Sequence, residues 1–105
     1  MKPVFETIDL NRNEDKKRFE IVVNGHFAFI DFKISGNKIA LIHTEVDEAL
    51  AGTGSATAVV AKTLQYIKDG GFSLLPYCPY GFAFIKKHPE WKAIVDPSFP
   101  AYDSL

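Results

Sequence analysis

The sequence lacks several features that define whole classes of protein. Its 105 residues include a single cysteine, Cys78, which excludes an intrachain disulfide framework and the clustered cysteines of a structural zinc site. No stretch reaches the roughly 18 to 20 apolar residues of a membrane span. The residues after Met1 lack the apolar core of a signal peptide. We therefore expect a cytoplasmic protein with no metal centre and no membrane contact.

An excess of charge of one sign is also lacking. Twelve Lys and Arg residues stand against thirteen Asp and Glu residues, with a formal net charge of -1 and no long run of either sign. Proteins that bind duplex nucleic acid or anionic membranes concentrate positive charge on one surface. We therefore expect no nucleic-acid partner.

Apolar and aromatic residues, in contrast, are plentiful. Hydrophobic residues make up 47% of the chain, and nine Phe, four Tyr and one Trp supply enough apolar surface for one core. No internal repeat or linker interrupts the sequence. We predict a single domain over residues 1–105, in which 1–16 form an irregular N-terminal segment and 96–105 form a tail.

Three strands are predicted in the first half of the chain. Residues 18–23, 26–34 and 39–46 alternate in the manner of strands, and Asn24-Gly25 between the first two is a strong hairpin signal. The strand over 26–34 is apolar enough to be buried on much of both faces. Unbroken alternation is expected in the third strand. One of its faces then carries Ile39, Leu41, His43 and Glu45, and the other carries Ala40, Ile42, Thr44 and Val46.

A helix is predicted after the three strands. Apolar residues recur at helical spacing over 56–67, and Gly70-Gly71 closes the helix. Residues 72–77 are short and apolar, so they return as a strand parallel to the third one through a right-handed crossover. Residues 80–87 and the segment after them are predicted to be helical. The fold class is therefore α+β, with a mixed sheet built from an antiparallel meander, a β-α-β crossover and C-terminal helices.

The junction between the third strand and the helix is rich in glycine. Residues 52–57 read Gly-Thr-Gly-Ser-Ala-Thr. Such a turn exposes backbone N–H groups at the positive end of the helix dipole, which suits a phosphate or pyrophosphate. It is neither the phosphate loop of nucleotide triphosphatases nor the dinucleotide fingerprint. By spacing alone, a helix start with small residues for tight packing is an equal interpretation.

The order of motifs along the chain is more specific than the turn alone. The motifs are His43-Thr44-Glu45-Val46, Gly52-Thr53-Gly54-Ser55-Ala56, Pro76-Tyr77-Cys78-Pro79-Tyr80 and His88-Pro89-Glu90-Trp91. Over residues 18 to 95 the sequence resembles the GCN5-related N-acetyltransferases, and within them the small single-domain YjdJ-like predicted acetyltransferases.

The resemblance implies a cosubstrate and its site. It implies that acetyl-coenzyme A lies between the third and fourth strands named above, which splay apart. Backbone amides near Glu45 and Val46 would then hold the pantetheine arm and stabilise the oxyanion. The pyrophosphate would lie on the amides of Gly52, Thr53, Gly54, Ser55 and Ala56. Ala51 stands where the family usually has Gln or Arg, and the helices that usually form the acceptor wall are missing. The acceptor site is therefore open or completed by a second subunit, and a homodimer is compatible with the short chain.

Four side chains are candidates for catalysis of acetyl transfer. Glu45 is the candidate base, with an exposed strand-end carboxylate as the alternative, and His43 either shares this task or is held within the sheet. Cys78 is either a transient acetyl carrier or a bystander thiol, since a helix start just beyond it favours the thiolate and free cysteines are often buried and inert. Tyr80 either gives a proton to the leaving thiolate or packs against Phe84.

Three functions remain open. The leading hypothesis is an acetyl-coenzyme A-dependent N-acetyltransferase that acts by direct transfer on an amine of a small molecule or a protein. The alternative is a domain that binds coenzyme A or an acyl form without catalysis, or an interaction module that keeps only the fold. His88 and Glu90 flank Pro89, and we interpret them as a helix-start packing motif around Trp91 rather than a metal site.

Overall fold

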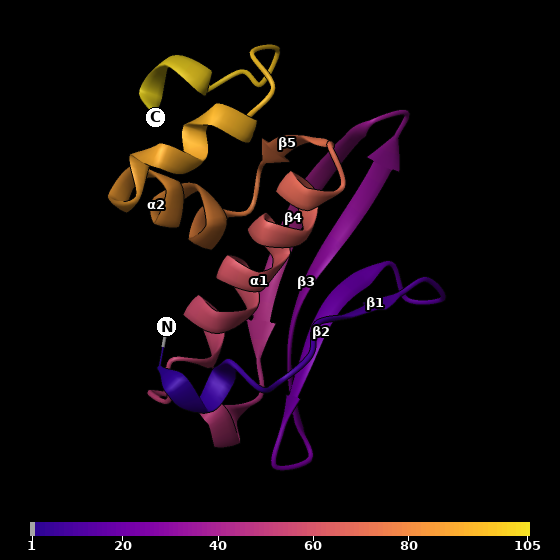
Figure 1. Cartoon of the computed structure of the whole chain (residues 1–105), viewed down its shortest axis with the longest axis vertical. Helices are drawn as coiled ribbons and strands as arrows, with labels where there is room; N and C mark the ends of the chain where they lie inside the picture. Colours follow the sequence, from indigo (N-terminus) through magenta and orange to yellow (C-terminus); the bar gives the residue numbers. More distant parts are fainter. Residues whose placement is uncertain (1) are drawn as a thin grey trace.

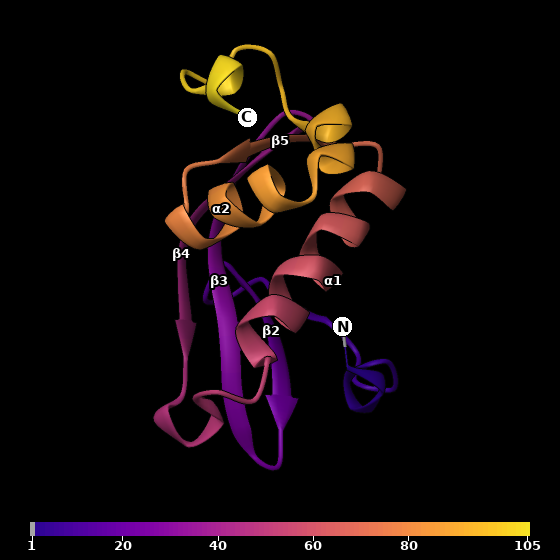
Figure 2. The same cartoon turned by 90° about the vertical axis from the view of Figure 1, so that its left-hand side faces the viewer.

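The computed structural model describes residues 2–105, and Met1 lies outside the described residues. One sheet with the strand order β1-β2-β3-β4-β5 carries both α-helices on the same side (Figures 1 and 2). The strands are β1 Asn11–Asn13, β2 Arg18–Val23, β3 His26–Ser35, β4 Lys38–Val46 and β5 Ser73–Pro76. The α-helices are α1 Ser55–Asp69 and α2 Pro79–Lys87. The 3-10 helices are η1 Pro3–Phe5, η2 Glu48–Leu50, η3 Pro89–Ile94 and η4 Tyr102–Ser104.

The sheet is mixed, as the sequence predicts. Strands β1 to β4 form an antiparallel meander, and β5 pairs with β4 in parallel after the α1 crossover. Gly70 ends α1 as its C-cap. The predicted α+β class, the meander and the β-α-β crossover are therefore confirmed.

The core lies between the sheet and α1. Phe19 and Ile21 of β2 and Ile30 of β3 are fully buried, as are Leu64 and Ile67 of α1. Complete burial of a side chain of this size contributes about 1.5–3 kcal/mol to folding, so this one layer of contacts holds the helix on the sheet. The opposite face of the sheet has no helix over it in Figures 1 and 2.

The prediction that 26–34 is buried on both faces is wrong. Ala28, Ile30 and Phe32 are buried, whereas Phe27 is 46% exposed and Phe29 is half-buried. The helices cover only one face of the sheet, so β3 has the one-sided burial of an antiparallel strand in a two-layer fold.

A β-bulge interrupts the alternation of β4. Asp31 pairs with His43 and the next β3 residue, Phe32, pairs with Leu41, so Ile42 is an extra residue without a partner on β3. A bulge of this kind shifts the strand by one residue and turns every later side chain to the other face. The predicted unbroken alternation is therefore wrong beyond Leu41.

The bulge changes which residues of β4 face the helices. Before it, Ile39 is buried against the helix layer. After it, Thr44 points to the helix side, where its hydroxyl contacts the start of α2. His43 and Glu45 turn to the uncovered face and are exposed.

Strand β5 covers only the first half of β4. Its partners run from Lys38 to Leu41, and Cys78 N donates to Leu41 O over 2.8 Å. Beyond that hydrogen bond the chain leaves the sheet and enters α2. The two parallel strands therefore part at Leu41, and Ile42 to Val46 have no β5 neighbour.

The N-terminal segment contains more structure than predicted. Within the segment 1–16, which was expected to be irregular, Pro3–Phe5 form a 3-10 helix and residues 11–13 form β1 on the edge of the sheet. Asn11 Nδ2 donates to Glu20 Oε1 over 2.9 Å, and Asn13 Nδ2 reaches the same oxygen at 3.4 Å. These side-chain contacts fasten β1 to β2. The sequence of β1 has no alternation of apolar residues that would predict them.

The segment 96–105, predicted as a tail, packs on the domain. Phe99 is only 6% exposed, with its ring centroid 5.1 Å from that of Tyr77. Asp96 N donates to Leu74 O over 2.8 Å, next to a parallel bridge between Leu74 and Val95. The C-terminal segment therefore covers the outer edge of β5.

Candidate active site

The turn between β4 and α1 is fixed by side-chain hydrogen bonds. Asp47 Oδ1 accepts from Ala49 N at 2.9 Å. This bond, together with His26 at 3.4 Å, holds the pKa of Asp47 below its usual range. Thr53 Oγ1 donates to Leu50 O over 2.6 Å and lies 2.7 Å from Ser55 Oγ. The glycine-rich residues therefore enter α1 from a defined position.

Two glycines of this turn adopt left-handed backbone angles. Gly52 has φ 74° and Gly54 has φ 91°, a region that side chains other than glycine rarely adopt. A Cβ on Gly52 would meet nothing within 4 Å, so its backbone faces open space. The first N–H groups of α1 have no acceptor one turn back in the helix. Lys2 adds positive charge beside them, with its Nζ 2.9 Å from Thr53 O.

A cavity of about 270 Å³, here called the turn groove, lies against these amides. Its lining residues are Val46, Leu50, Ala51, Gly52, Gly54, Ser55, Ala56 and Tyr80. The structure thus brings together all the residues predicted to bind the cosubstrate except Thr53, which sits behind the turn and braces it. Tyr80 joins them from the first turn of α2.

A larger cavity of about 530 Å³, here called the α2 groove, adjoins the turn groove at Tyr80. Its lining residues are Thr57, Tyr80, Ala83, Phe84, Lys86, Lys87 and His88. The sequence analysis did not assign most of them to the site. A signal was available, because Tyr80, Ala83, Phe84 and Lys87 recur at the spacing of one helix face.

Tyr80 stands between the two grooves. It is 43% exposed, and its hydroxyl lies 3.0 Å from Thr57 Oγ1 on α1. This contact connects the first turn of α2 to the start of α1 across the line where the grooves meet. The hydroxyl of Tyr80 is therefore directed at the cavity rather than into the core.

Cys78 is enclosed. Its side chain is buried, at 1% exposure for the residue, and its Sγ accepts from Gly81 N over 3.5 Å as the N-cap of α2. Thr44 Oγ1 lies 2.6 Å from the same sulfur. The thiol thus fills the gap between the unpaired half of β4 and α2.

The backbone of β4 turns free amides toward that gap. Asp47 N donates to Phe27 O over 2.9 Å, so residue 47 faces β3. In an antiparallel ladder the residues alternate between facing the partner strand and facing away. Val46 and Thr44 therefore direct their N–H groups away from β3, toward the edge that β5 leaves open. The amide predicted near Glu45 and Val46 is that of Val46, because Glu45 faces β3.

His43 and Glu45 lie together on the uncovered face of the sheet. His43 Nε2 is 3.9 Å from Glu45 Oε1, and both side chains are largely exposed. Glu45 lines a cavity of about 400 Å³, here called the open-face hollow, with Phe27, Phe29, Val46, Asp47 and Glu48. Val46 lines both this hollow and the turn groove. The two cavities are therefore neighbours at the end of β4.

One comparison identifies the family. Residues 18–94 match the family described as GCN5-related N-acetyl-transferase. The chain belongs to this family.

Acyl transfer is therefore the general class of chemistry for this GCN5-related N-acetyl-transferase, and its resemblance to the YjdJ-like branch stays a prediction. The match spans β2 through η3, and so includes the turn groove and the α2 groove. The N-terminal β1 and the C-terminal segment that covers β5 fall outside it.

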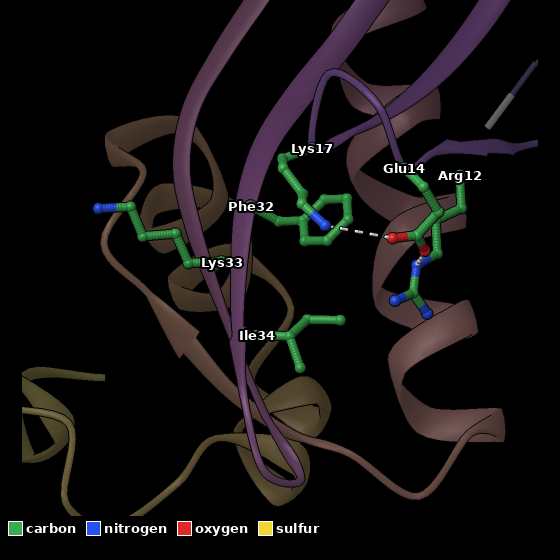
Figure 3. A pocket seen from close by; sticks show the side chains of 6 residues that line it. All are labelled: Arg12, Glu14, Lys17, Phe32, Lys33 and Ile34. Atoms are coloured by element: carbon green, nitrogen blue, oxygen red, sulfur yellow. Dashed lines mark ion pairs between the residues drawn. The ribbon is translucent and has the colours of Figure 1, made fainter.

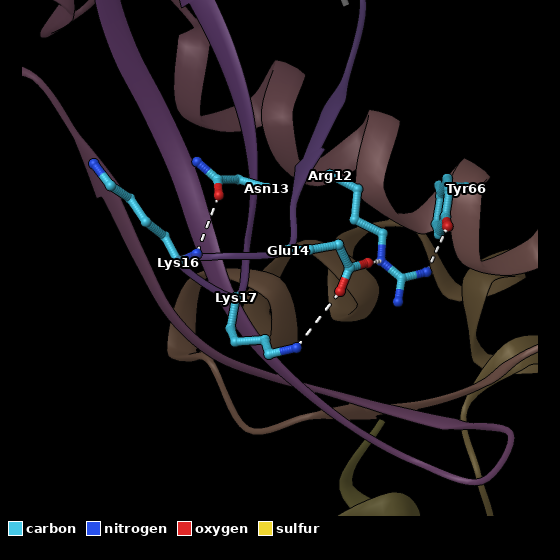
Figure 4. Close-up of polar contacts among 6 residues, drawn as sticks. All are labelled: Arg12, Asn13, Glu14, Lys16, Lys17 and Tyr66. Atoms are coloured by element: carbon cyan, nitrogen blue, oxygen red, sulfur yellow. Dashed lines mark hydrogen bonds and ion pairs between the residues drawn. The ribbon is translucent and has the colours of Figure 1, made fainter.

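The structure has a further cavity, of about 390 Å³, at the β1 edge of the sheet (Figure 3). Arg12 and Lys17 are both paired with Glu14 there, and Lys33 points away from them in Figure 3. Arg12 also donates to Tyr66 OH over 2.8 Å, a hydrogen bond that raises the pKa of the guanidinium (Figure 4). These contacts fasten β1 to α1, and no residue predicted for the site lies among them.

The His88 and Glu90 side chains, interpreted from the sequence as part of a packing motif, lie close together. His88 Nδ1 lies 3.9 Å from Glu90 Oε1 in the turn from α2 into η3. Within residues 2–105, no group of three or more His, Cys, Asp or Glu side chains is placed to hold a metal ion. Over the same residues, no helix has the length and apolar content needed to cross a membrane.

Proposed function

We propose that this single domain transfers an acetyl group from acetyl-coenzyme A directly to a primary amine. One observation carries the proposal: beside the half of β4 that β5 leaves unpaired, the turn groove shares Val46 with the open-face hollow and Tyr80 with the α2 groove. A donor can then lie on the helix side of β4 and an acceptor on the uncovered side.

The turn groove suits the pyrophosphate of the cosubstrate. Its anion would accept hydrogen bonds from the amides of Gly54 and Ala56, at the positive end of the α1 dipole, while Ser55 N donates to Thr53 Oγ1 over 3.3 Å. Gly52 leaves the backbone open on its side, whereas a Cβ on Gly54 would meet the side chains of Phe5 and Lys2 at 3.5 and 3.6 Å. Lys2, beside the same turn, adds a positive charge.

The α2 groove suits the nucleotide end. Lys86 and Lys87 in the last turn of α2 supply positive charge for a phosphate. Phe84, whose ring lies against that of His88 with centroids 4.5 Å apart, offers an aromatic surface for a base. The groove's volume of about 530 Å³ is within the range of small-molecule sites.

The reaction needs three functions beyond binding. The nitrogen lone pair of the acceptor forms a bond to the thioester carbonyl carbon, and the carbonyl electrons move to oxygen. The N–H of Val46 would donate to that oxyanion. As the oxyanion collapses, the carbon–sulfur bond breaks and the electron pair leaves on sulfur. Tyr80 would give its phenolic proton to the thiolate, and Glu45, directly or through water, would take the proton from nitrogen, with His43 beside it.

Direct transfer is favoured over a covalent acetyl-cysteine. An attacking thiolate must reach the thioester carbon, and Cys78 is enclosed by Thr44 and the first turn of α2. Its contacts are those of a group that holds the gap between β4 and α2. We therefore assign Cys78 a positioning role.

The experiment that tests the function is calorimetric titration with acetyl-coenzyme A and with coenzyme A. We expect saturable binding that Gly52→Val weakens at least about tenfold, since a β-branched side chain at φ 74° strains the backbone and enters the open space beside the turn-groove amides. The matched control is Gly36→Val, at a positive φ of 60° in the β3–β4 turn, outside both grooves. Equal effects of the two substitutions, or no binding by the wild type, would refute the proposed site.

A second function is favoured by one specific observation. Ala51, which lines the turn groove, puts no cation or amide side chain on it where the family usually has Gln or Arg. A domain that binds coenzyme A without catalysis fits that feature. It predicts saturable binding but no acetylation of any amine above the uncatalysed rate, whereas transfer that falls with Tyr80→Phe supports the enzyme.

A further inference from the structure

The uncovered face of the sheet carries two cross-strand rows in which a phenylalanine lies beside carboxylates. Glu20, Phe29 and Glu45 are direct cross-strand neighbours, and so are Val22 and Phe27. Asp47 follows Phe27 through the hydrogen bond from its amide to Phe27 O. Directly opposite residues of antiparallel strands share one face. Val22 and Phe27 are 45% and 46% exposed, so apolar surface extends from the open-face hollow across to β2.

One cationic side chain of the protein itself, that of Arg18, already lies on this face. The Arg18 guanidinium carbon lies 3.7 Å from the centroid of the Phe29 ring, and Arg18 Nε lies 3.6 Å from Asp31 Oδ1. A cation over an aromatic face beside a carboxylate is a favourable arrangement. Phe27 has the same kind of neighbour in Asp47, and within residues 2–105 no cation lies over its ring.

The charged residues that line the hollow are all acidic. Its lining includes Glu45, Asp47 and Glu48 but no lysine or arginine. The nearby cationic groups are Arg18, which lies over the Phe29 ring, His26, 3.4 Å from Asp47, and His43, 3.9 Å from Glu45. Carboxylates next to an apolar surface complement a chain that carries both methylene groups and ammonium groups.

We propose that the uncovered face binds a basic, extended polypeptide segment and directs a lysine side chain of that segment into the open-face hollow. This inference rests on the proposed acetyl transfer and names its acceptor class. The lysine methylenes would pack on Phe27, and its amine would lie beside Glu45. Val46 lines both cavities, so the amine would meet the thioester beside this residue. The Val22–Phe27 surface, which a small amine would leave unused, contacts the backbone of the segment.

A second copy of this chain is a poorer occupant of the same face. A symmetric contact would bring Glu45, Asp47 and Glu48 of one protomer toward the same residues of the other. Like charges across an interface oppose association.

The test uses the whole chain and two labelled peptides. One short fluorescein-labelled peptide has a single lysine flanked by arginines, and its partner has glutamates in place of the arginines. Binding of each peptide is measured by anisotropy with and without coenzyme A, and initial rates of acetylation are compared with those for hexylamine. Titration of acetyl-coenzyme A in parallel reports on the donor site separately.

The variants remove the apolar and the acidic parts of the face in turn. Phe27→Thr keeps a strand-forming residue and is expected to weaken binding of the basic peptide about tenfold. Glu48→Gln removes one exposed charge and is expected to weaken it about two- to fivefold, with a smaller loss at high salt. The matched controls are Val4→Thr, another exposed apolar residue, and Asp103→Asn on η4.

The outcomes separate this inference from the proposed function. Binding of the basic peptide at least about tenfold tighter than that of the acidic one, lost in Phe27→Thr but not in Val4→Thr, supports the inference even if the donor fails to bind. Equal binding of the two peptides overturns it, as does hexylamine acetylation as efficient as that of the peptide. Dimerisation in sedimentation runs that Phe27→Thr abolishes also overturns it, in favour of a second copy.

Discussion

Thr44 Oγ1 lies 2.6 Å from Cys78 Sγ and joins the unpaired half of β4 to the first turn of α2. The sulfur also accepts a hydrogen bond from Gly81 N, so two elements converge on one atom. A group held in this way sets the distance between a strand and a helix. The Cys78 thiol would have to break both contacts before it could attack a thioester.

We expect Cys78→Ala to retain acetyl transfer, with kcat within about threefold of wild type, and to lower the free energy of unfolding by about 1–2 kcal/mol. Thr44→Val removes the same contact from the other side and serves as a control for the structural effect. Steady-state kinetics and denaturant unfolding measure the two quantities. An acetylated Cys78 peptide, trapped in the absence of acceptor and identified by mass spectrometry, would establish the covalent route instead.

We expect Tyr80→Phe to lower kcat at least about a hundredfold, in the range found for loss of a general acid. The KM for acetyl-coenzyme A should hardly change, because the ring that lines both grooves remains. Tyr77→Phe is the matched control, since Tyr77 is 50% exposed and packs its ring on Phe99 outside the grooves. A weaker affinity with unchanged kcat would assign Tyr80 to packing against Phe84.

We expect Asp96 to make folding stability depend on acid pH. Hydrogen bonds from Ser98, and the charge of Lys38 at 3.7 Å, hold the pKa of Asp96 below its ordinary value. A carboxyl whose pKa is lower in the folded state stabilises the fold above its unfolded pKa, and loses that contribution as the pH falls through the folded one. Wild type should therefore lose stability below about pH 4, and Asp96→Asn should lose less.

Thermal unfolding at a series of pH values measures this difference, with the exposed Asp103→Asn as the control. The melting curves of wild type and Asp96→Asn should converge at the acid end of the series. Parallel curves throughout would mean that the Ser98 and Lys38 contacts do not hold the C-terminal segment in solution.

We expect Phe99→Ala to destabilise the fold by about 3 kcal/mol, the usual scale for removing a buried phenylalanine. Phe99 contacts the rings of Tyr77 and Phe82, so its loss also frees the segment that covers β5. Val4→Ala, at a residue that is 62% exposed, should cost much less. Denaturant unfolding measures both, and equal small losses would restore the interpretation of 96–105 as a loose tail.

Elements with a strong local signal were predictable from the sequence. The Asn24-Gly25 turn fixes the β2–β3 hairpin, and the helical spacing of apolar residues fixes α1, because in both cases neighbours in the chain carry the structure. The same holds for the site around Gly52 and Gly54, whose positive φ angles follow from residue type.

Features that depend on distant contacts were not predictable in this way. The bulge at Ile42 needs β3 as its partner, so the pattern of β4 alone suggests unbroken alternation. Phe99 is buried only because Tyr77 and Phe82 are folded beneath it. The roles of the site side chains remain predictions.

The bulge at Ile42 divides β4 into two parts, in which the odd-numbered residues face opposite sides of the sheet. Up to Leu41, the odd-numbered positions are committed to the core, so a change there affects stability. From His43 onward the odd-numbered positions face solvent and the hollow, and a change there can alter what is bound while the packing stays the same. One extra residue thus places the substitutions that change the exposed surface and those that change the core at separate positions within a single strand of nine residues.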